Sequence, residues 1–445
     1  MQQLSPPDSI VRSLIGNRIY QRGRHKLSQY VIMRKHDGSV LLYHTMTCEL
    51  LLLSLDEWKA YKMNRELYNR CFLTEEEADE FAFAKKIKRL RQMVYKKYTK
   101  DHLHTPITRF WILTTTGCNA RCFYCHEKGI PNMVMTEETA DRVIEYILAQ
   151  KKDQLRFMWY GGEPTMRSNI IHKIAQAVSD HGITFTSGMI SNGYLFDEEL
   201  AKEAKELWNL TDIQITLDGM EKTYNKVKDY IYRDSASPFV RVIKNIRHLL
   251  ENEVLVRVRL NVDIYNMDEI DILINYLSDE FNGYDNFSIY IAPLMEDCLG
   301  TDYIREEKDR AAVFSFYKQT SSRLMSRGML TKSDLPTVMK SEMRCIALSN
   351  VRVIYPNGQF AFCHDYFKGV LSGGLGDREP ADEERLEYGK CLPDEQKCKS
   401  CTRYPQCVRL VKCFNNRCTK ENVDEWIWNT GNEMVWKYEN KKTAP

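Results

Sequence analysis

The chain has 445 residues, of which 43% are hydrophobic and 28% are charged, and its formal net charge is +2. This composition is ordinary for a globular protein with more than one domain, and so small a net charge argues against a nucleic-acid or anionic-membrane partner. No run of about 18 apolar residues suggests a membrane span, and residues 1–18 lack the apolar core of a signal peptide, so we expect a cytoplasmic protein.

Residues 1–100 are expected to form a small domain of strands and helices. Two short strands flank Asp37-Gly38, a dipeptide that favours a tight hairpin turn. Ser54–Glu57 and Thr74–Glu77 have the spacing of helix capping boxes, so a helix is expected at each. The second helix runs into a basic amphipathic stretch, which is most simply a solvated helix leading to the next domain. This arrangement is compatible with a winged-helix fold.

Residues 101–330 alternate apolar segments with amphipathic stretches. Such alternation favours a parallel sheet whose strands are joined by crossover helices. The six expected strands are 107–115, 155–160, 184–191, 212–217, 254–262 and 286–294. Six β/α units predict an α/β domain built as a partial (β/α)6 TIM-like barrel.

Polar motifs follow the first four of these strands. A loop with three cysteines follows the first strand, Gly161-Gly162-Glu163-Pro164 the second, Ser191-Asn192-Gly193 the third and Asp218-Gly219 the fourth. Parallel α/β folds place their active sites at the carboxyl ends of the strands. We therefore expect the four motifs to meet at one mouth of the barrel.

Residues 331–445 are expected to form a third, cysteine-rich domain. The chain has 14 cysteines, and eight of them lie between positions 345 and 418. In a cytosolic protein such clustering indicates metal or redox chemistry rather than disulfides. A hairpin is expected around Asn357-Gly358. Little else there predicts a hydrophobic core, so we expect bound metal to organise this part.

The three cysteines after the first strand are Cys118, Cys122 and Cys125. Thiolates at this Cys-x3-Cys-x2-Cys spacing can bind three corners of a cubane iron–sulfur cluster and leave the fourth iron open to another ligand. A structural zinc ion normally takes four protein ligands. Since His126 is the one nearby candidate for a fourth ligand, zinc is the weaker alternative.

The cysteine loop, with the aromatic Tyr124 before its last cysteine, resembles the signature of the radical S-adenosylmethionine (SAM) superfamily. The resemblance implies that Cys118, Cys122 and Cys125 bind a [4Fe–4S] cluster, that SAM chelates its open iron, and that Tyr124 lies near the adenine. SAM would then be cleaved reductively to a 5′-deoxyadenosyl radical.

The strand-end motifs extend this resemblance. Gly161, Gly162 and Glu163 are similar to the family's segment that binds the SAM amino group, with Glu163 as the charged acceptor and the glycines allowing a close approach to a ligand. Ser191 and Asn192 resemble its ribose-contacting residues. Asp218 also matches a family motif, with a helix cap as the alternative.

The C-terminal cysteines resemble the SPASM extension of radical SAM enzymes, which carries two auxiliary [4Fe–4S] clusters. The portions Cys345-x12-Gly358-x4-Cys363 and Cys398-x2-Cys401-x5-Cys407 match its pattern. The chain departs from that pattern in the spacing of the last cysteines, Cys413 and Cys418, and in the additional Cys391. The alternative is a pair of zinc ribbons, because Cys-x2-Cys is also a common zinc spacing.

The resemblance implies an outer and an inner auxiliary cluster, three [4Fe–4S] clusters in all. The outer ligands are assigned as Cys398, Cys401, Cys407 and Cys418. The inner ligands are assigned as Cys345, Cys363 and Cys413, with Cys391 as a possible fourth.

Radical SAM enzymes with this extension mostly modify peptides or proteins. Residues 1–100 look like the element that binds a leader peptide by adding a strand to a sheet edge. This implies a maturase that installs a carbon–carbon or thioether crosslink in a ribosomally made precursor peptide, with flavodoxin or ferredoxin as an electron donor. His126, Glu296 and Asp297 lie near strand ends as candidate bases, although each is more simply a surface or packing residue.

Three rival interpretations remain open at the level of sequence. The first is an anaerobic sulfatase-maturating (formylglycine-forming) enzyme, which would need no leader peptide. The second is a radical SAM enzyme for a small molecule. The third is a non-enzymatic zinc-binding interaction protein, which would bind a partner through residues 1–100 and use its cysteines only for structure. Separately, the alternative to leader-peptide binding by residues 1–100 is a dimerisation or packing module.

Overall fold

The computed structural model describes most of the chain. Its described residues are 2–5, 26–60, 63, 66–67, 72–74, 77–102, 105–125, 127–232, 236–294, 305–330, 350–361, 363, 373–376, 382–388, 390–407, 409, 411 and 418–442. They fall into two compact units. The first contains the described residues of Met1–Asp101 and Leu386–Pro445, and the second contains those of His102–Asp334 and Ile346–Arg385.

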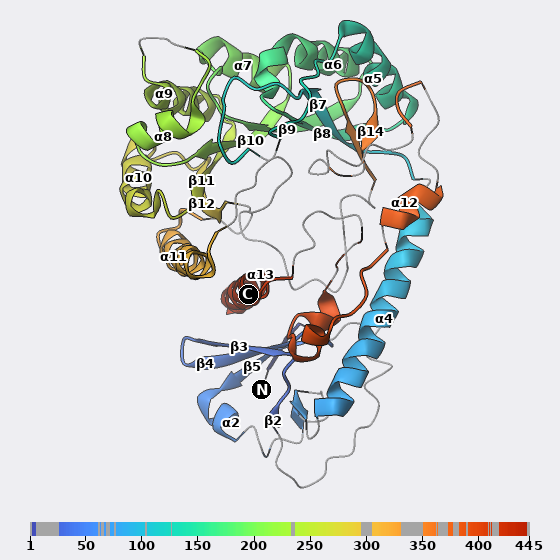
Figure 1. Cartoon of the computed structure of the whole chain (residues 1–445), viewed down its shortest axis with the longest axis vertical. Coiled ribbons are helices and arrows are strands. Elements are labelled where there is room, and N and C mark those ends of the chain that lie inside the picture. The colour runs from blue at the N-terminus through green and yellow to red at the C-terminus, as the bar shows by residue number, and fades with distance from the viewer. Residues whose placement is uncertain are drawn as a thin grey trace. The chain divides into compact units, whose positions relative to one another are not determined.

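The second unit is built on a sheet whose first six strands are parallel and follow the chain in order (Figure 1). These strands are β7 (Arg109–Thr115), β8 (Gln154–Gly161), β9 (Thr184–Ser191), β10 (Leu210–Leu217), β11 (Leu255–Val262) and β12 (Phe287–Pro293). All six predicted strands are confirmed, with ends that differ by no more than about two residues. The sheet is open between β12 and its other edge, which is the predicted partial barrel.

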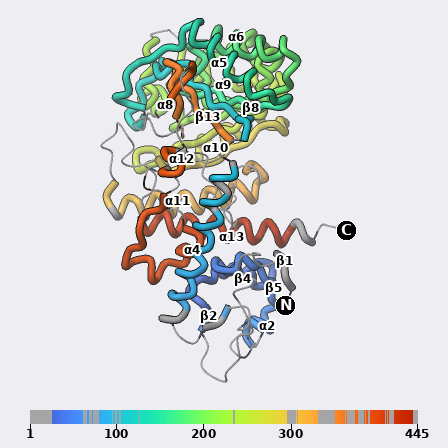
Figure 2. The backbone as a smooth tube through the Cα atoms, turned by 90° about the vertical axis from the view of Figure 1, so that its right-hand side faces the viewer, coloured from blue at the N-terminus to red at the C-terminus, as the bar shows by residue number. Residues whose placement is uncertain are grey.

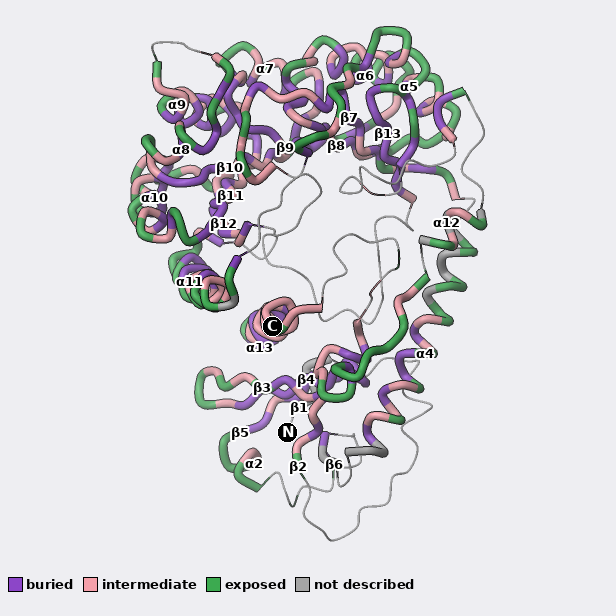
Figure 3. Tube along the Cα trace, viewed as in Figure 1, coloured by how far each residue is buried: buried purple, intermediate pink, exposed green. Residues whose placement is uncertain are grey.

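Helices connect consecutive strands of this sheet and cover one side of it (Figure 1). They are α5 (Glu137–Ala149), η2 (Pro164–Arg167), α6 (Ser168–Asp180), α7 (Glu198–Glu206), α8 (Glu221–Lys228), α9 (Pro238–Glu251) and α10 (Met267–Glu280), and α11 (Glu307–Ser326) follows β12. In α6, for example, Ile170, Ile171, Ile174 and Val178 are buried. These positions recur at helical spacing, so they lie on one face of the helix. Figure 3 shows buried and exposed positions alternating along the helices of this unit.

The hairpin expected around Asn357-Gly358 forms, but it belongs to the barrel sheet. Its strands are β13 (Val351–Ile354) and β14 (Phe360–Ala361), which pair antiparallel. Strand β13 also pairs in parallel with β7, from Val351 opposite Arg109 to Ile354 opposite Ile112. The hairpin therefore extends the six parallel strands to a sheet of eight.

The first unit contains a four-stranded antiparallel sheet in the order β1-β5-β4-β3. Its strands are β1 (Gln2–Ser5), β3 (Val31–His36), β4 (Ser39–His44) and β5 (Leu50–Ser54), and a separate pair joins β2 (Lys26–Leu27) to β6 (Leu73–Thr74). Asp37 and Gly38 turn the predicted hairpin between β3 and β4, both with positive φ. The predicted capping box at Ser54 and Glu57 is confirmed at the start of α2 (Leu55–Lys59). The second predicted box, Thr74–Glu77, lies partly outside the described residues.

Two long helices complete this unit, together with short ones (Figure 2). The long helices are α4 (Glu77–His102) and α13 (Lys420–Lys442), and the short ones are η5 (Gln396–Ser400) and η6 (Tyr404–Gln406). Helix α12 (Asp382–Tyr388) contains the point in the sequence, between Arg385 and Leu386, at which the chain passes from the second unit to the first. Trp426, Met434 and Tyr438 of α13 share a buried apolar cluster with Tyr43 and Leu50 of the sheet. The expectation that little in the C-terminal part could build a hydrophobic core is therefore wrong, because α13 buries an apolar face there.

The grouping of segments also differs from the predicted division at residues 100 and 330. The N-terminal and C-terminal segments share the first unit, because α13 packs on the N-terminal sheet, while residues 350–361 join the barrel sheet. Neither partnership is local in sequence, so no periodicity signals it. Within the described part of the chain, no helix is both long and apolar enough to cross a membrane.

Candidate active site and cluster sites

The loop of residues 116–125, here called the cysteine loop, follows β7 and is fixed by the segment after β8. The N–H of Gly162 donates to the carbonyl oxygen of Thr115 (3.1 Å), and the N–H of Glu163 donates to that of Gly117 (3.0 Å). Two of the four predicted motifs are therefore joined by main-chain hydrogen bonds at the carboxyl ends of their strands.

This contact explains the two consecutive glycines. A Cβ atom added to Gly161 would lie 2.0 Å from the carbonyl oxygen of Thr115, and one added to Gly162 would lie 2.2 Å from that of Gly117. Gly161 also has a φ of +120°, a conformation that side chains rarely allow. The sequence suggested that these glycines allow a ligand to approach closely. In the structure they allow the chain itself to approach, at the end of β7 and in the cysteine loop.

The end of α8 holds the cysteine loop from another side. The N–H of Arg121 donates to the carbonyl oxygen of Lys228 (2.7 Å), and the N–H of Ile231 donates to that of Asn119 (2.9 Å). The loop is thus clamped by two segments that are far from it in sequence.

The three thiols of the loop are half-buried and influence one another electrostatically. Burial, followed by the nearby Glu163 carboxylate, raises the pKa of Cys118 to about 12, and burial raises that of Cys125 to about 11. Burial also raises the pKa of Cys122, while the Lys228 ammonium acts in the opposite direction. Such thiols stay protonated at neutral pH until a metal centre replaces their protons.

Glu163 is fully buried and joins the second motif to the third. Its carboxylate accepts hydrogen bonds from the N–H of Thr165 (3.1 Å), the hydroxyl of Ser191 (2.9 Å) and the N–H of Asn192 (2.8 Å). Burial raises the pKa of Glu163, and the hydrogen bonds from Thr165, Asn192 and Ser191 oppose that rise. Because every partner here is a donor, the site suits an ionised carboxylate.

Asn192 returns from the third motif to the cysteine loop. Its amide nitrogen donates to Asn119 Oδ1 (2.6 Å) and lies 3.8 Å from Cys118 Sγ. The amide nitrogen of Asn119 is buried and has no hydrogen-bond partner among the described residues. An orphaned donor beside a thiol is an observation that fits a bound group at this position.

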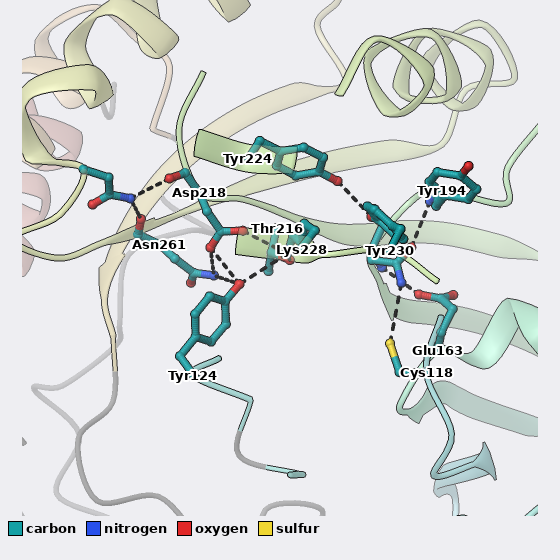
Figure 4. Close-up of polar contacts among 12 residues, drawn as sticks. Cys118, Tyr124, Glu163, Tyr194, Thr216, Asp218, Tyr224, Lys228, Tyr230 and Asn261 are labelled. Carbon is teal, nitrogen blue, oxygen red and sulfur yellow. Dashed lines mark hydrogen bonds and ion pairs between the residues drawn. The ribbon is translucent and has the colours of Figure 1, made fainter. Parts of the chain in front are cut away.

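Asp218, the fourth motif, points into the same site and meets Tyr124 of the cysteine loop (Figure 4). Its Oδ1 accepts from the Tyr124 hydroxyl (2.7 Å) and from the Asn261 amide (2.9 Å), and its Oδ2 lies 3.0 Å from Lys228 Nζ. The residue at the N-cap of α8 is Met220, so Asp218 does not serve as the helix cap that the sequence left open.

Lys228 is a site residue that sequence reasoning missed. It is 2% exposed, and its ammonium also donates to Thr216 Oγ1 (2.7 Å) and Tyr124 Oη (3.2 Å). Burial alone would lower the pKa of Lys228, but the Asp218 carboxylate and the Cys122 sulfur raise it well above its ordinary value. The sequence offered one signal for Lys228. Tyr224 and Lys228 lie four residues apart in α8, so they share one face of that helix, and a lysine on the same face as an aromatic residue can be buried with it.

Four C-terminal cysteines surround a second candidate site, which lies within the first unit. Cys398, Cys401, Cys407 and Cys418 line one cavity with an empty volume of about 360 Å³, open to solvent. Main-chain hydrogen bonds hold the turns that carry Cys398, Cys401 and Cys407. The N–H of Cys401 donates to the carbonyl oxygen of Cys398 (3.3 Å), and the N–H of Cys407 donates to that of Tyr404 (3.2 Å). These are the cysteines assigned to the outer cluster.

The inner ligand set is only partly described. Cys345 and Cys413 lie outside the described residues, as do the candidate bases His126, Glu296 and Asp297. Cys363 belongs to the second unit and Cys391 to the first. Burial raises the pKa of Cys391, with a further increase from Cys407, so Cys391 lies in the electrostatic range of the four-cysteine cavity. The inner set therefore stays a prediction.

The metal at the four-cysteine cavity stays a prediction. In the part of the chain that the structure describes, no three His, Cys, Asp or Glu side chains are arranged to hold one metal ion. Four thiolates can serve either a structural zinc ion or a [4Fe–4S] cluster, and the resemblance to the SPASM extension favours the cluster.

The barrel is similar in sequence to a known family. Residues 112–277 match the family model described as the radical SAM superfamily. A serine-type anaerobic sulfatase-maturating enzyme of Bacteroides thetaiotaomicron is 27% identical over 194 residues, 40% of this chain and 44% of that protein. The radical SAM cyclopropyl synthase TigE of Paramaledivibacter caminithermalis is 22% identical over 293 residues, 56% of this chain and 61% of TigE. The chain spans about half the length of the curated relatives that it matches.

Two solved structures share the fold. One is native anSMEcpe with bound AdoMet and the Kp18Cys peptide, with a TM-score of 0.56, 16% identity and coverage of 75% of this chain and 99% of that chain. The other is Streptococcus suis SuiB bound to the precursor peptide SuiA, with a TM-score of 0.52, 14% identity and coverage of 88% and 95%.

Proposed function

The chain carries a radical SAM superfamily domain, and from this premise we propose that it is a peptide maturase that crosslinks a ribosomally made precursor peptide. The observation that carries the proposal is the cysteine loop, in which three thiols are clamped at the barrel mouth beside Glu163, Asn192 and Lys228. The peptide substrate is supported by two neighbours of the same fold, anSMEcpe with the Kp18Cys peptide and SuiB with SuiA.

The residues of the chain fit the two groups that this domain family uses. Cys118, Cys122 and Cys125 would hold a [4Fe–4S] cluster, and SAM would supply a 5′-deoxyadenosyl radical when bound. The role of the protein's own residues is to orient the bound groups and to exclude water from the site. Glu163 fixes the backbone of Asn192 through a buried hydrogen bond, and Lys228 brings a fixed positive charge next to Cys122.

The atom balance of a crosslink defines what else the site must provide. One C–H bond and one X–H bond (X is carbon or sulfur) are broken and one C–X bond forms. One hydrogen atom leaves in 5′-deoxyadenosine, the other leaves as a proton to a base, and one electron leaves to an acceptor. Iron–sulfur clusters supply one-electron acceptors of this kind, and the four-cysteine cavity is a candidate position for one. The reductive cleavage of SAM requires an electron donor, for which we propose flavodoxin or ferredoxin.

We further propose that a leader peptide docks on the first unit by adding a strand at β3. The β5 edge of its sheet is paired with β1, whereas no strand pairs with the outer edge of β3 among the described residues. In a two-residue hairpin the pair flanking the turn is hydrogen-bonded, so His36 and Arg34 direct their backbone groups to β4. Met33 and Lys35 then direct theirs outward, where an extended peptide can pair with them.

Docking at this edge can be tested with one substitution and its matched control. Met33→Pro removes an outward N–H without touching the hydrogen bonds to β4, whereas Met33→Ala removes the side chain and keeps the N–H. We expect Met33→Pro to weaken binding of a fluorescent leader peptide about tenfold, the effect of one lost hydrogen bond, and Met33→Ala to bind like wild type. Equal binding by both variants would rule out the β3 edge.

The experiment for the function itself uses the anaerobically reconstituted protein, SAM, a reductant and the peptide encoded by a short reading frame beside that of this chain. Mass spectrometry is expected to show a product lighter by two hydrogen atoms and dependent on the leader segment. The main alternative is a sulfatase maturase, which the Bacteroides relative supports. Formylglycine formed in a leaderless Cys- or Ser-containing sulfatase peptide, with no crosslink in the precursor, would establish that alternative.

A further inference from the structure

Lys88 of α4 lines the four-cysteine cavity, although it comes from the N-terminal segment of the chain. Its side chain is 9% exposed, and its ammonium lies 2.6 Å from Asp394 Oδ1. The same ammonium stands 4.4 Å from the centre of the Tyr404 ring. A cation is thus buried at the wall of a site lined by Cys398, Cys401, Cys407 and Cys418.

The position of Lys88 is fixed by the core of the first unit. The hydroxyl of Tyr404 donates to Asp394 Oδ2 (2.6 Å), so Asp394 ties the ammonium to the Tyr404 side chain. Tyr404 is itself buried in an apolar cluster with Ala84 and Ile87 of α4 and with Cys398. Lys88 therefore has little freedom to withdraw from the cavity, because the helix that carries it packs directly on the cysteine segment.

The Lys88–Asp394 ion pair presents its cation at the cavity. Lys88 is among the residues that line the cavity, whereas Asp394 is not. The ammonium therefore lies at the wall that carries the four cysteines, although it has a carboxylate partner.

Two other cations line the same cavity, and their side chains are more exposed than that of Lys88. Lys397 and Arg409 each form an ion pair with Glu395, and their side chains are 51% and 19% exposed. Solvent and the shared carboxylate screen their charges, and an exposed charge has a smaller effect than a buried one. Lys397 is therefore a matched control for Lys88, since both are lysines on the same wall.

We propose that Lys88 sets the reduction potential of the iron–sulfur cluster that Cys398, Cys401, Cys407 and Cys418 hold, an inference that rests on the proposed function because it takes the cavity to be a cluster site. Reduction adds one electron to the cluster and breaks no bond. A buried ammonium at the wall stabilises this added negative charge and raises the potential. The N-terminal segment, which we propose binds the peptide, thereby supplies a residue that controls the redox site.

The test is a redox titration followed by electron paramagnetic resonance, with dithionite as the reductant, in the Cys118→Ala/Cys122→Ala/Cys125→Ala background. The signal of this cluster is identified by its loss in Cys398→Ala/Cys401→Ala. Lys88→Met and Lys88→Gln are expected to shift its midpoint potential to more negative values. Lys88→Arg, which keeps the charge, is expected to restore most of the potential, and Lys397→Met to shift it less than Lys88→Met.

Each result decides between the inference and its premise. An unchanged potential in both neutral variants, with iron content and circular dichroism like those of the parent, would overturn the role of Lys88 alone. Loss of the auxiliary iron from both neutral variants would also overturn it, since Lys88 would then be needed to form the site. If the Cys118→Ala/Cys122→Ala/Cys125→Ala parent bound no iron at all, the proposed auxiliary site itself would be ruled out.

Discussion

Lys228 brings a positive charge into the barrel mouth at a point closed to solvent. Its ion pair with Asp218 is buried on both sides, with side-chain exposures of 2% and 0%. Tyr124 and Asn261 complete the hydrogen bonds of Asp218. A buried pair of this kind is held together by the cost of leaving either partner alone in a low dielectric.

We therefore predict that Lys228→Met destabilises the protein by about 3–5 kcal/mol, because the Asp218 carboxylate stays buried without its counter-charge. Adding Asp218→Asn to Lys228→Met removes the buried charge that Lys228→Met leaves without a partner. The double variant is therefore expected to recover part of the lost stability. Urea unfolding followed by tryptophan fluorescence measures both. A double variant that is no more stable than Lys228→Met would contradict the importance of the ion pair.

Asp394 provides a prediction for pH. Partial burial raises the pKa of Asp394, but hydrogen bonds from Lys88 and Tyr404 outweigh that effect and hold it below the ordinary value of 3.8. The folded chain therefore binds fewer protons here than the unfolded chain. This contribution to stability is fully present above the ordinary pKa and is lost as the pH falls through the lower pKa of the folded state.

We expect Asp394→Asn to lower the urea midpoint at pH 7 and the difference from wild type to shrink as the pH falls below the ordinary pKa of 3.8 and through the lower pKa of the folded state. The control is Asp56→Asn, because the Asp56 side chain is 93% exposed and its ion pair with Lys59 lies on the surface. A difference for Asp394→Asn that does not change with pH would show that ionisation is unimportant.

At the residue scale, sequence predicted the polar groups that follow strands and missed the one on a helix. The cysteine loop, Glu163, Asn192 and Asp218 come together because parallel strands end at one edge of the sheet. Lys228 is brought there by the packing of α8, and a lysine on a helix is more often a solvated residue. Roles toward SAM for these residues stay predictions.

At the scale of elements, the end of β8 approaches the end of β7 so closely that no methyl group fits between them, directly before the cysteine loop. Gly161→Ala would place a methyl group 2.0 Å from the carbonyl oxygen of Thr115, at a φ of +120°. We predict that this variant loses most of the iron bound by the cysteine loop, since the end of β7, from which that loop starts, must move to relieve the overlap. Anaerobic reconstitution followed by iron analysis measures the effect.

The control for this prediction is Gly182→Ala. Gly182 also has a positive φ, +71°, but a Cβ atom there would meet nothing within 4 Å. Its cost is therefore the backbone strain alone, about 1–2 kcal/mol, with iron content unchanged. Wild-type iron in Gly161→Ala would mean that the loop tolerates the methyl group and that the contact is not needed.

Element types could be predicted from the sequence better than element partners. The six parallel strands follow from apolar segments that alternate with amphipathic helices, which is a local signal. The hairpin β13–β14 was also predicted, but its pairing with β7 was not, because the strands that meet are more than two hundred positions apart. Helix α13 was missed, since its apolar positions become a face only against the N-terminal sheet.

At the scale of the whole molecule, the two ends of the chain build one unit. Tyr30 and Ala84, from the N-terminal segment, share an apolar cluster with Cys398 and Tyr404, from the C-terminal segment. The proposed peptide-binding sheet and the proposed auxiliary cluster site therefore belong to one core. The barrel with the cysteine loop forms the other unit.

The measurement that tests the central claim most directly is SAM turnover by the anaerobically reconstituted protein, compared with Cys118→Ala/Cys122→Ala/Cys125→Ala. We predict that wild type forms 5′-deoxyadenosine, and that the triple variant forms none and loses about four iron atoms per chain, the content of one [4Fe–4S] cluster. Zinc in place of iron, or 5′-deoxyadenosine formed equally by both proteins, would contradict the account.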